Sequence, residues 1–182
     1  MARTNQVAAG MRGLLVGLLL VAGAAQAREM AGVPVPDSVP VGGKQISLAH
    51  TALHKQLFFK VYVWSLYLEQ QPQKASEAIS LNCIKRLHFR FLRKIDREQL
   101  VDAFRDGLSV NPALRGAPLN ADFERLLASL RDVPEGGDLV ITYLPEGGLQ
   151  VGGDASRGLR IPGKSFADAL FVSWLHDHPI FP

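Results

Sequence analysis

The side chains of this sequence that could do chemistry are mainly cationic, and they gather around two predicted strands. Guanidinium and imidazolium groups make strong charge-assisted hydrogen bonds to anions. Placed over an apolar, aromatic-lined sheet, they could bind the carboxylate of a mostly apolar ligand. The alternative is that they are solvated side chains on an exposed sheet face. The residues in question are His50, His54, Arg86, His88, Arg90 and Arg93.

Other catalytic and metal-binding patterns are weak. His176-Asp177-His178 places two imidazoles two positions apart but lacks the third protein ligand usual in a catalytic zinc site. Cationic side chains also suit the end of a last helix, so we expect no metal there. The single cysteine, Cys83, belongs to no motif that would pair it with a catalytic base, and it is interpreted as a small buried apolar residue. No nucleophile motif or phosphate-binding loop is found, and we expect no cofactor.

The N-terminus has the composition of a secretory signal peptide. Arg3 and Arg12 precede an apolar run at 13–25, and Ala25-Gln26-Ala27 resembles a cleavage site. We predict cleavage after Ala27, which leaves one domain over 28–182; the alternative is an uncleaved membrane anchor. No later stretch is long and apolar enough to span a bilayer, so no stable membrane insertion is expected after cleavage.

Charge and cysteine content limit the compartment and the partners. Without Arg3 and Arg12, the formal net charge falls from +3 to +1. The mature domain therefore lacks the excess of basic residues that is typical of a nucleic-acid-binding protein. An exported domain with one cysteine has no internal disulfide, which suits a bacterial periplasm better than a eukaryotic extracellular space. We expect a periplasmic protein.

Periodicity divides the mature chain into strands, then helices, then hairpins and a last helix. Residues 28–43 hold several prolines and predict an extended entry segment. Helical spacing of apolar residues follows Asp96, Asn120 and Ser165, each of which could cap a helix. Alternation or β-branched and aromatic composition predicts strands at 45–50, 57–69, 85–91, 138–144, 149–151 and 158–161.

This order of elements predicts an α+β fold. Short turns between successive strands imply antiparallel pairing, and helices that are apolar on one side must cover one face of the resulting sheet. In the strand at 85–91, Leu87, Phe89 and Phe91 would face the core. Arg86, His88 and Arg90 would face the other way.

The stretch LHKQLFFKVYVWSLYLE at 53–69 resembles a signature of bacterial exported chalcone isomerase-like proteins. In these proteins a basic residue precedes Phe-Phe-Lys-Val-Tyr-Val and Leu-Tyr-Leu. The similarity continues through 86–111, 136–151 and 163–179 in the expected order. It implies an open-faced β-sandwich, an antiparallel sheet with helices packed on one face and a cleft between them. In plant chalcone isomerases this cleft closes a flavanone ring, and in related plastid proteins it binds fatty acids.

The resemblance also implies particular site residues. His54, or His50 if the loop differs in length, falls where an arginine contacts the anionic oxygen of the ligand. Tyr62 falls on a threonine that faces the cleft. Independently of the resemblance, Arg90 or Arg93 of the cationic group would be alternative carboxylate partners. The catalytic tyrosine and lysine of the enzymes come from the following helical region, but residues 95–142 contain neither. The catalytic arginine, tyrosine and lysine therefore lack counterparts.

The sequence leaves three hypotheses for the function. The leading hypothesis is a non-catalytic binder of a small amphipathic ligand, a fatty acid or an aromatic acid. The second is an intramolecular lyase or isomerase acting on an aromatic enone, with His54 as general base, because an imidazole titrates near the pH that this task needs. The third is a structural, partner-binding periplasmic domain.

Overall fold

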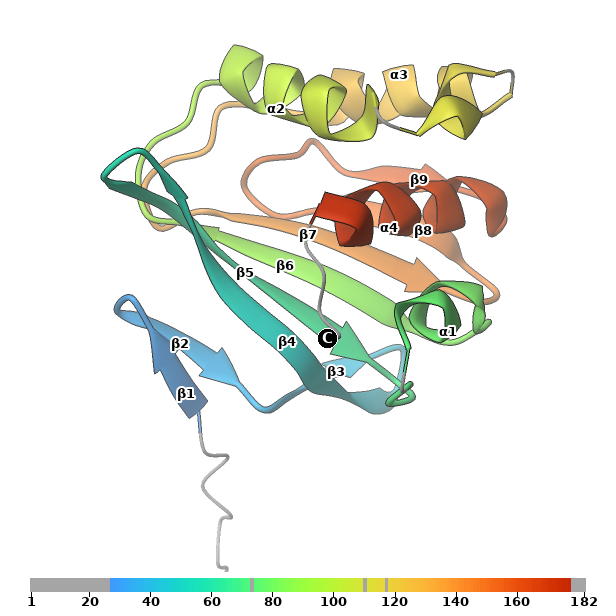
Figure 1. Cartoon of the computed structure of the whole chain (residues 1–182), viewed down its shortest axis with the longest axis horizontal. Helices are drawn as coiled ribbons and strands as arrows, with labels where there is room; N and C mark the ends of the chain where they lie inside the picture. The colour runs from blue at the N-terminus through green and yellow to red at the C-terminus, as the bar shows by residue number, and fades with distance from the viewer. Residues whose placement is uncertain (1–26, 73, 110, 117, 178–182) are drawn as a thin grey trace, which may run out of the picture.

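The main element of the structure is an antiparallel sheet in which seven strands lie side by side in chain order (Figure 1). The structure is a computed structural model and describes residues 27–72, 74–109, 111–116 and 118–177. The strands are β3 (Ser38–Val41), β4 (Lys44–Gln56), β5 (Phe59–Leu68), β6 (Lys85–Phe91), β7 (Asp138–Leu144), β8 (Gly148–Gly152) and β9 (Leu159–Ile161). The predicted α+β class is confirmed.

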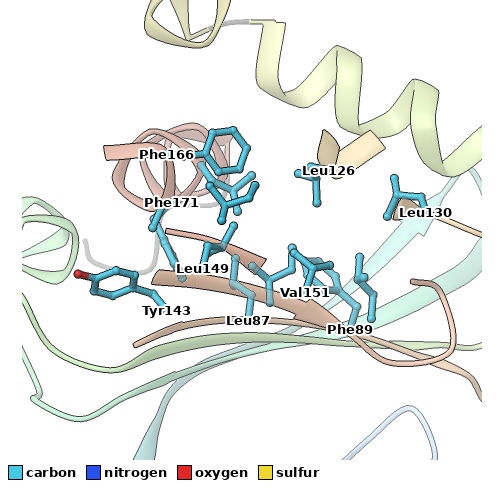
Figure 2. Close-up of a cluster of buried hydrophobic side chains, with 14 of the residues drawn as sticks. Leu87, Phe89, Leu126, Leu130, Tyr143, Leu149, Val151, Phe166 and Phe171 are labelled. Atoms are coloured by element: carbon cyan, nitrogen blue, oxygen red, sulfur yellow. The ribbon is translucent and has the colours of Figure 1, made fainter. Parts of the chain in front are cut away.

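The helices lie on one face of this sheet, which we call the inner face (Figure 1). They are α1 (Ala75–Ser80), α2 (Arg97–Ser109), the 3-10 helix η1 (Pro112–Arg115), α3 (Leu119–Ser129) and α4 (Ser165–Asp177). Figure 2 shows how the inner face packs against α3, α4 and the residue that follows α3, through Leu87, Phe89, Leu126, Leu130, Leu149, Val151, Phe166 and Phe171. As predicted, these periodic apolar residues form the core. None of the helices among the described residues is long and apolar enough to cross a membrane.

A short hairpin covers part of the opposite, outer face (Figure 1). Its strands are β1 (Ala27–Met30) and β2 (Val33–Pro36). β2 shares a small pocket with side chains of β5 and β6, and Val35 is buried there. The predicted extended segment is therefore a hairpin followed by β3. The predicted signal peptide lies outside the described residues except for Ala27, which pairs with Pro36.

Strand β4 is longer than the predicted strand at 45–50. It continues to Gln56, and its pairing with β5 shifts register twice, between Leu48 and His50 and between His54 and Lys55. A bulge moves the following side chains to the other face of the sheet, so the alternation that marks a strand is broken. β5 in turn begins at Phe59, two residues later than predicted, because Leu57 and Phe58 form the turn.

The helix starts differ slightly from the predicted caps. Asp96 does form half of a capping box, since its backbone N–H donates to Gln99 Oε1 at 3.2 Å. Asn120 is not a cap: it lies inside α3, whose N-cap is Pro118. Proline suits a helix start because it has no N–H that needs a partner. Ser165 was predicted to cap the last helix, but it is the first helical residue of α4.

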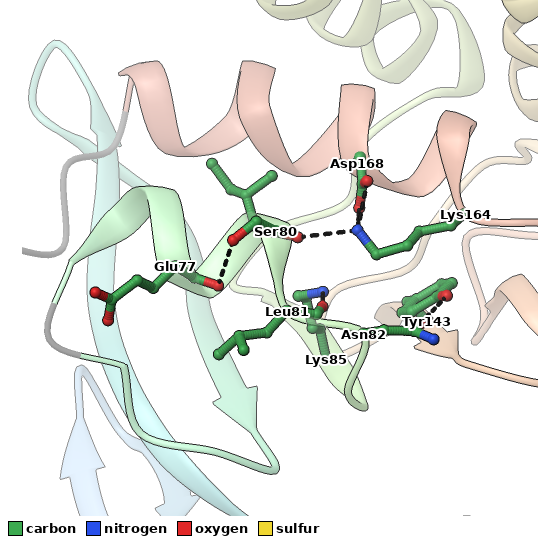
Figure 3. A network of polar contacts seen from close by, with 9 residues as sticks. Glu77, Ser80, Leu81, Asn82, Lys85, Tyr143, Lys164 and Asp168 are labelled. Atoms are coloured by element: carbon green, nitrogen blue, oxygen red, sulfur yellow. Dashed lines mark hydrogen bonds and ion pairs between the residues drawn. The ribbon is translucent and has the colours of Figure 1, made fainter.

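A buried polar network joins α1, α4 and the sheet (Figure 3). Lys85 is almost fully buried, its Nζ donates to the Leu81 carbonyl at the end of α1, and it lies 5.1 Å from the centre of the Tyr143 ring. Burial lowers the pKa of this lysine. Tyr143 donates its hydroxyl to Asn82 at 2.7 Å, and Lys164, which precedes α4, donates to a carbonyl of α1. These contacts fix the start of β6 against the helices.

Candidate functional site

An aromatic pair on the inner face connects β4 with β5. His54 and Tyr62 are cross-strand partners, and their rings stack at 4.6 Å between centroids with only 8° between their planes. Tyr62 also meets Phe89 and Phe91 of β6 edge-on, at 5.7 and 5.8 Å. Edge-to-face and offset contacts of this kind hold aromatic rings in fixed orientations. The structure therefore brings together two of the predicted ligand-binding residues.

Further aromatic rings extend this pair toward α4. His50 lies 5.0 Å from Trp64, and Trp64 meets Trp174 of α4 edge-on at 5.6 Å. Trp174 also contacts Phe89 at 4.8 Å. We call the whole set the aromatic wall: His50, His54, Tyr62, Trp64, Phe89 and Trp174.

The exposure of the aromatic wall is graded. Trp64 and Phe89 are buried, whereas His50, His54 and Tyr62 are only half-buried, as is Trp174. The half-buried rings offer apolar surface together with polar atoms. A tyrosine hydroxyl is protonated at neutral pH and is able to donate a hydrogen bond. Burial raises the pKa of the Tyr62 phenol well above its usual range, so it stays protonated at alkaline pH as well. This combination suits an amphipathic molecule.

Arg90 lies on the outer face, away from the aromatic wall. It alternates with Phe89 and Phe91, and its Nε pairs with Asp138 at 2.9 Å while Nη1 donates to the Gly136 carbonyl. His88 shares this face and the same carboxylate, at 2.9 Å. The sheet therefore separates Arg90 from His54 and Tyr62.

Arg93 is separate from Arg90 and lies near the turn of the β4–β5 hairpin. Its guanidinium carbon is 5.2 Å from the centre of the Phe59 ring. Arg86, which completes the predicted cationic group, donates from Nε to Thr142 Oγ1 at 3.0 Å on the outer face. Arg86, His88 and Arg90 thus all bind residues of β7 on the outer face, away from the ligand-binding residues predicted on the inner face.

The remaining candidates contribute little chemistry. Cys83 is buried, and desolvation raises the pKa of its thiol, which opposes formation of a thiolate. His176 and Asp177 end α4, and His178 lies outside the described residues. Within the part of the chain that the structure describes, no three histidine, cysteine or carboxylate side chains gather as a metal site would require.

Sequence reasoning did not assign Trp174 to the site. Its helical spacing after Phe166, Leu170 and Phe171 predicts only a buried position. That it reaches the rings of Trp64 and Phe89 depends on how α4 crosses the sheet. The sequence offered one signal, the rarity of tryptophan, since only two occur in the chain. In the structure these two rings contact each other.

The raised pKa of Tyr62 leads to a prediction for alkaline stability. A tyrosine whose folded-state pKa exceeds its unfolded value of about 10 stabilises the fold below that pH and loses this contribution as pH rises above it. Wild-type stability should therefore fall above about pH 10, with Tyr62 contributing a slope of about 1.4 kcal/mol per pH unit. Tyr62→Phe should show a shallower fall in urea unfolding between about pH 9 and 11. Equal slopes for both proteins would contradict this assignment.

Comparison with known proteins gives the context of this site. Among solved structures, a fatty-acid binding protein of Arabidopsis thaliana matches with a TM-score of 0.58 at 13% sequence identity, covering 86% of this chain and 92% of that chain. At this identity the likeness shows the fold alone. No curated protein gives a significant match. The family model for chalcone isomerase-like proteins matches residues 27–181. The chain therefore belongs to the chalcone isomerase-like family.

Proposed function

We propose that this protein binds a small amphipathic ligand, a fatty acid or an aromatic acid, along the half-buried part of the aromatic wall, and that it does so without catalysis. The observation that carries the proposal is the stacked His54–Tyr62 pair at the edge of an apolar surface. A ligand site of this type needs mostly apolar contacts and a few placed polar groups. His54 would bind the carboxylate, and the Tyr62 hydroxyl would donate a second hydrogen bond.

Two further observations support a binder over an isomerase. Residues 95–142, which include α2 and α3, contain no tyrosine or lysine to polarise a reacting substrate. Developing charge in a transition state needs several placed donors or cations, whereas binding needs only one or two polar contacts. The matching Arabidopsis protein is described as a fatty-acid binding protein, which agrees with this preference.

The site of action is part of the proposal. We place the domain in the periplasm after removal of residues 1–27, on the basis of the charged N-terminus, the apolar run and the small residues that follow it. The intact mass of the exported protein should correspond to a chain that starts at Arg28. A mass that includes 1–27 would contradict this step.

Titration of oleate into wild type and variants tests the binding mode. His54→Ala should weaken the affinity about tenfold or more, because a hydrogen bond to a charged group contributes about 1.5–3 kcal/mol. Tyr62→Phe should weaken it about fivefold, through loss of one neutral donor. His88→Ala is the matched control, since it is the same substitution on the outer face, where the histidine pairs with Asp138.

Methyl oleate separates carboxylate recognition from apolar contact. Wild type should prefer oleate over its methyl ester, and His54→Ala should lose this preference. The same titration with cinnamate would show which class of acid is favoured. Equal affinities for His54→Ala and His88→Ala, or no binding of any acid to wild type, would overturn the proposed function.

A further inference from the structure

The turn between β4 and β5 and the first residue of β5 carry three consecutive large apolar side chains that are open to solvent. Leu57 is 85% exposed, Phe58 96% and Phe59 60%. We call these three residues the apolar tip. Figure 1 shows the turn at the end of the long β4–β5 hairpin, remote from α1 at the other end of the sheet. Contiguous apolar residues on a surface mark an interaction site more often than single ones do.

Turn geometry does not explain these residue types. Leu57 has a φ of +55°, in the left-handed region. This conformation is costly for a residue with a branched side chain and free of cost for glycine. A glycine or asparagine would therefore serve the turn better, and leucine at this position has a cost in stability. Such a cost indicates a use outside the turn itself.

A group of cations surrounds the apolar tip. Lys55 and Lys60 are cross-strand partners one pair further from the turn than Gln56 and Phe59. The Arg93 guanidinium lies over the Phe59 ring. All three side chains are exposed, and none takes part in an ion pair found among the described residues. The sequence from Lys44 to Leu68 contains no acidic residue. We call these three cations the basic collar.

We propose that the apolar tip and the basic collar dock the protein onto the surface of an anionic lipid bilayer. Leucine and phenylalanine would enter the boundary between headgroups and acyl chains, and the lysines would remain at the level of the lipid phosphates. Each basic side chain near an anionic membrane surface adds to the attraction. The basic collar would repel a second copy of itself, which favours lipid over self-association as the partner of this tip.

Docking in this way has a consequence for the aromatic wall. His54 and Tyr62 pair directly inside Lys55 and Lys60 along the hairpin. A docked hairpin would hold the half-buried part of the aromatic wall close to the membrane, where amphipathic acids are dissolved. This consequence rests on the proposed function, whereas the docking itself does not.

Sedimentation with vesicles tests the docking. Vesicles of phosphatidylcholine alone and of phosphatidylcholine mixed with phosphatidylglycerol are incubated with the purified protein, whose N-terminus is defined by intact mass. Wild type should bind the mixed vesicles more tightly. Phe58→Ser should reduce partitioning about tenfold or more, because the phenylalanine that would be buried in the bilayer is replaced by a polar residue. The matched control, Val172→Ser, changes an exposed apolar residue of α4 and should have no effect.

Two further variants separate docking from folding and from charge in general. Leu57→Gly should weaken vesicle binding severalfold. The urea midpoint should stay unchanged or rise, because glycine adopts the left-handed conformation of this position without strain. Lys60→Gln should weaken binding about fivefold on anionic vesicles only. Its control is Lys74→Gln, at the exposed N-cap of α1.

Three results would overturn the docking proposal. One is wild type that fails to bind mixed vesicles. Another is an effect of Phe58→Ser no larger than that of Val172→Ser. The third is a wild-type dimer in sedimentation velocity that Phe58→Ser converts to a monomer, which would assign the tip to a second copy. The oleate titration is read separately, because Phe58→Ser should leave the affinity for oleate unchanged if both proposals hold.

Discussion

Phe89→Ala should lower the free energy of unfolding by about 3–5 kcal/mol, the range found when a buried aromatic residue is truncated in a packed core. Phe89 is 4% exposed and lies in the main core cluster. Its ring contacts Tyr62 at 5.7 Å and Trp174 at 4.8 Å. Such aromatic pairs add about 0.5–1.5 kcal/mol beyond the buried area. Urea unfolding measures the change.

The chain supplies a matched control for this substitution. Phe58→Ala removes the same atoms from a side chain that is 96% exposed, so it should change the free energy of unfolding by no more than about 0.5 kcal/mol. Phe89→Ala should also weaken ligand binding, since Tyr62 and Trp174 would lose the ring that separates and orients them. Similar free energies of unfolding for the two variants would show that the Phe89 ring is not closely packed against its neighbours in the aromatic wall.

Gly148→Ala should be about as costly for a different reason. Gly148 begins β8 with a φ of +70°, and an added Cβ would lie 2.2 Å from the Ile161 carbonyl oxygen and 2.8 Å from Pro162 Cα. Both neighbours are backbone atoms, so relief requires movement of the segment that joins β9 to α4. The left-handed conformation costs about 1–2 kcal/mol and overpacking about 1–3 more. We expect a loss of about 2–5 kcal/mol.

Gly158→Ala separates the two causes. Gly158 also has a positive φ, +84°, but an added Cβ would meet nothing within 4 Å. Its replacement should therefore cost only the conformational part, about 1–2 kcal/mol. Thermal or urea unfolding of both variants gives the comparison. An equal loss at the two positions would mean that β8 does not hold the β9–α4 connection as closely as the structure indicates.

Much of the fold followed from periodicity. β6 and β7 have the predicted bounds, and the alternation of Leu87, Phe89 and Phe91 with polar residues gave the two faces of the sheet. β4 could not be predicted in full, because register shifts at His50 and Lys55 hide its period. α1 escaped prediction because six residues hold too few turns for a helical pattern.

The candidate site was predicted less completely. The family resemblance indicated His54 and Tyr62, and the structure stacks them. The alternation of the strand at 85–91 already placed Arg90 opposite the core residues Phe89 and Phe91, which conflicted with its assignment as a carboxylate partner of the ligand. The exposure of Phe58 could not be predicted, because an apolar run next to a strand has the same composition whether it is buried or forms a turn.

Native mass spectrometry of the wild-type protein tests the central claim, ligand binding, most directly. The purified protein is measured as isolated and after incubation with a mixture of fatty acids and aromatic acids. We predict a one-to-one adduct with the mass of an acid, retained in His88→Ala and strongly reduced in His54→Ala. Wild type that carries no acid in either state would contradict the claim.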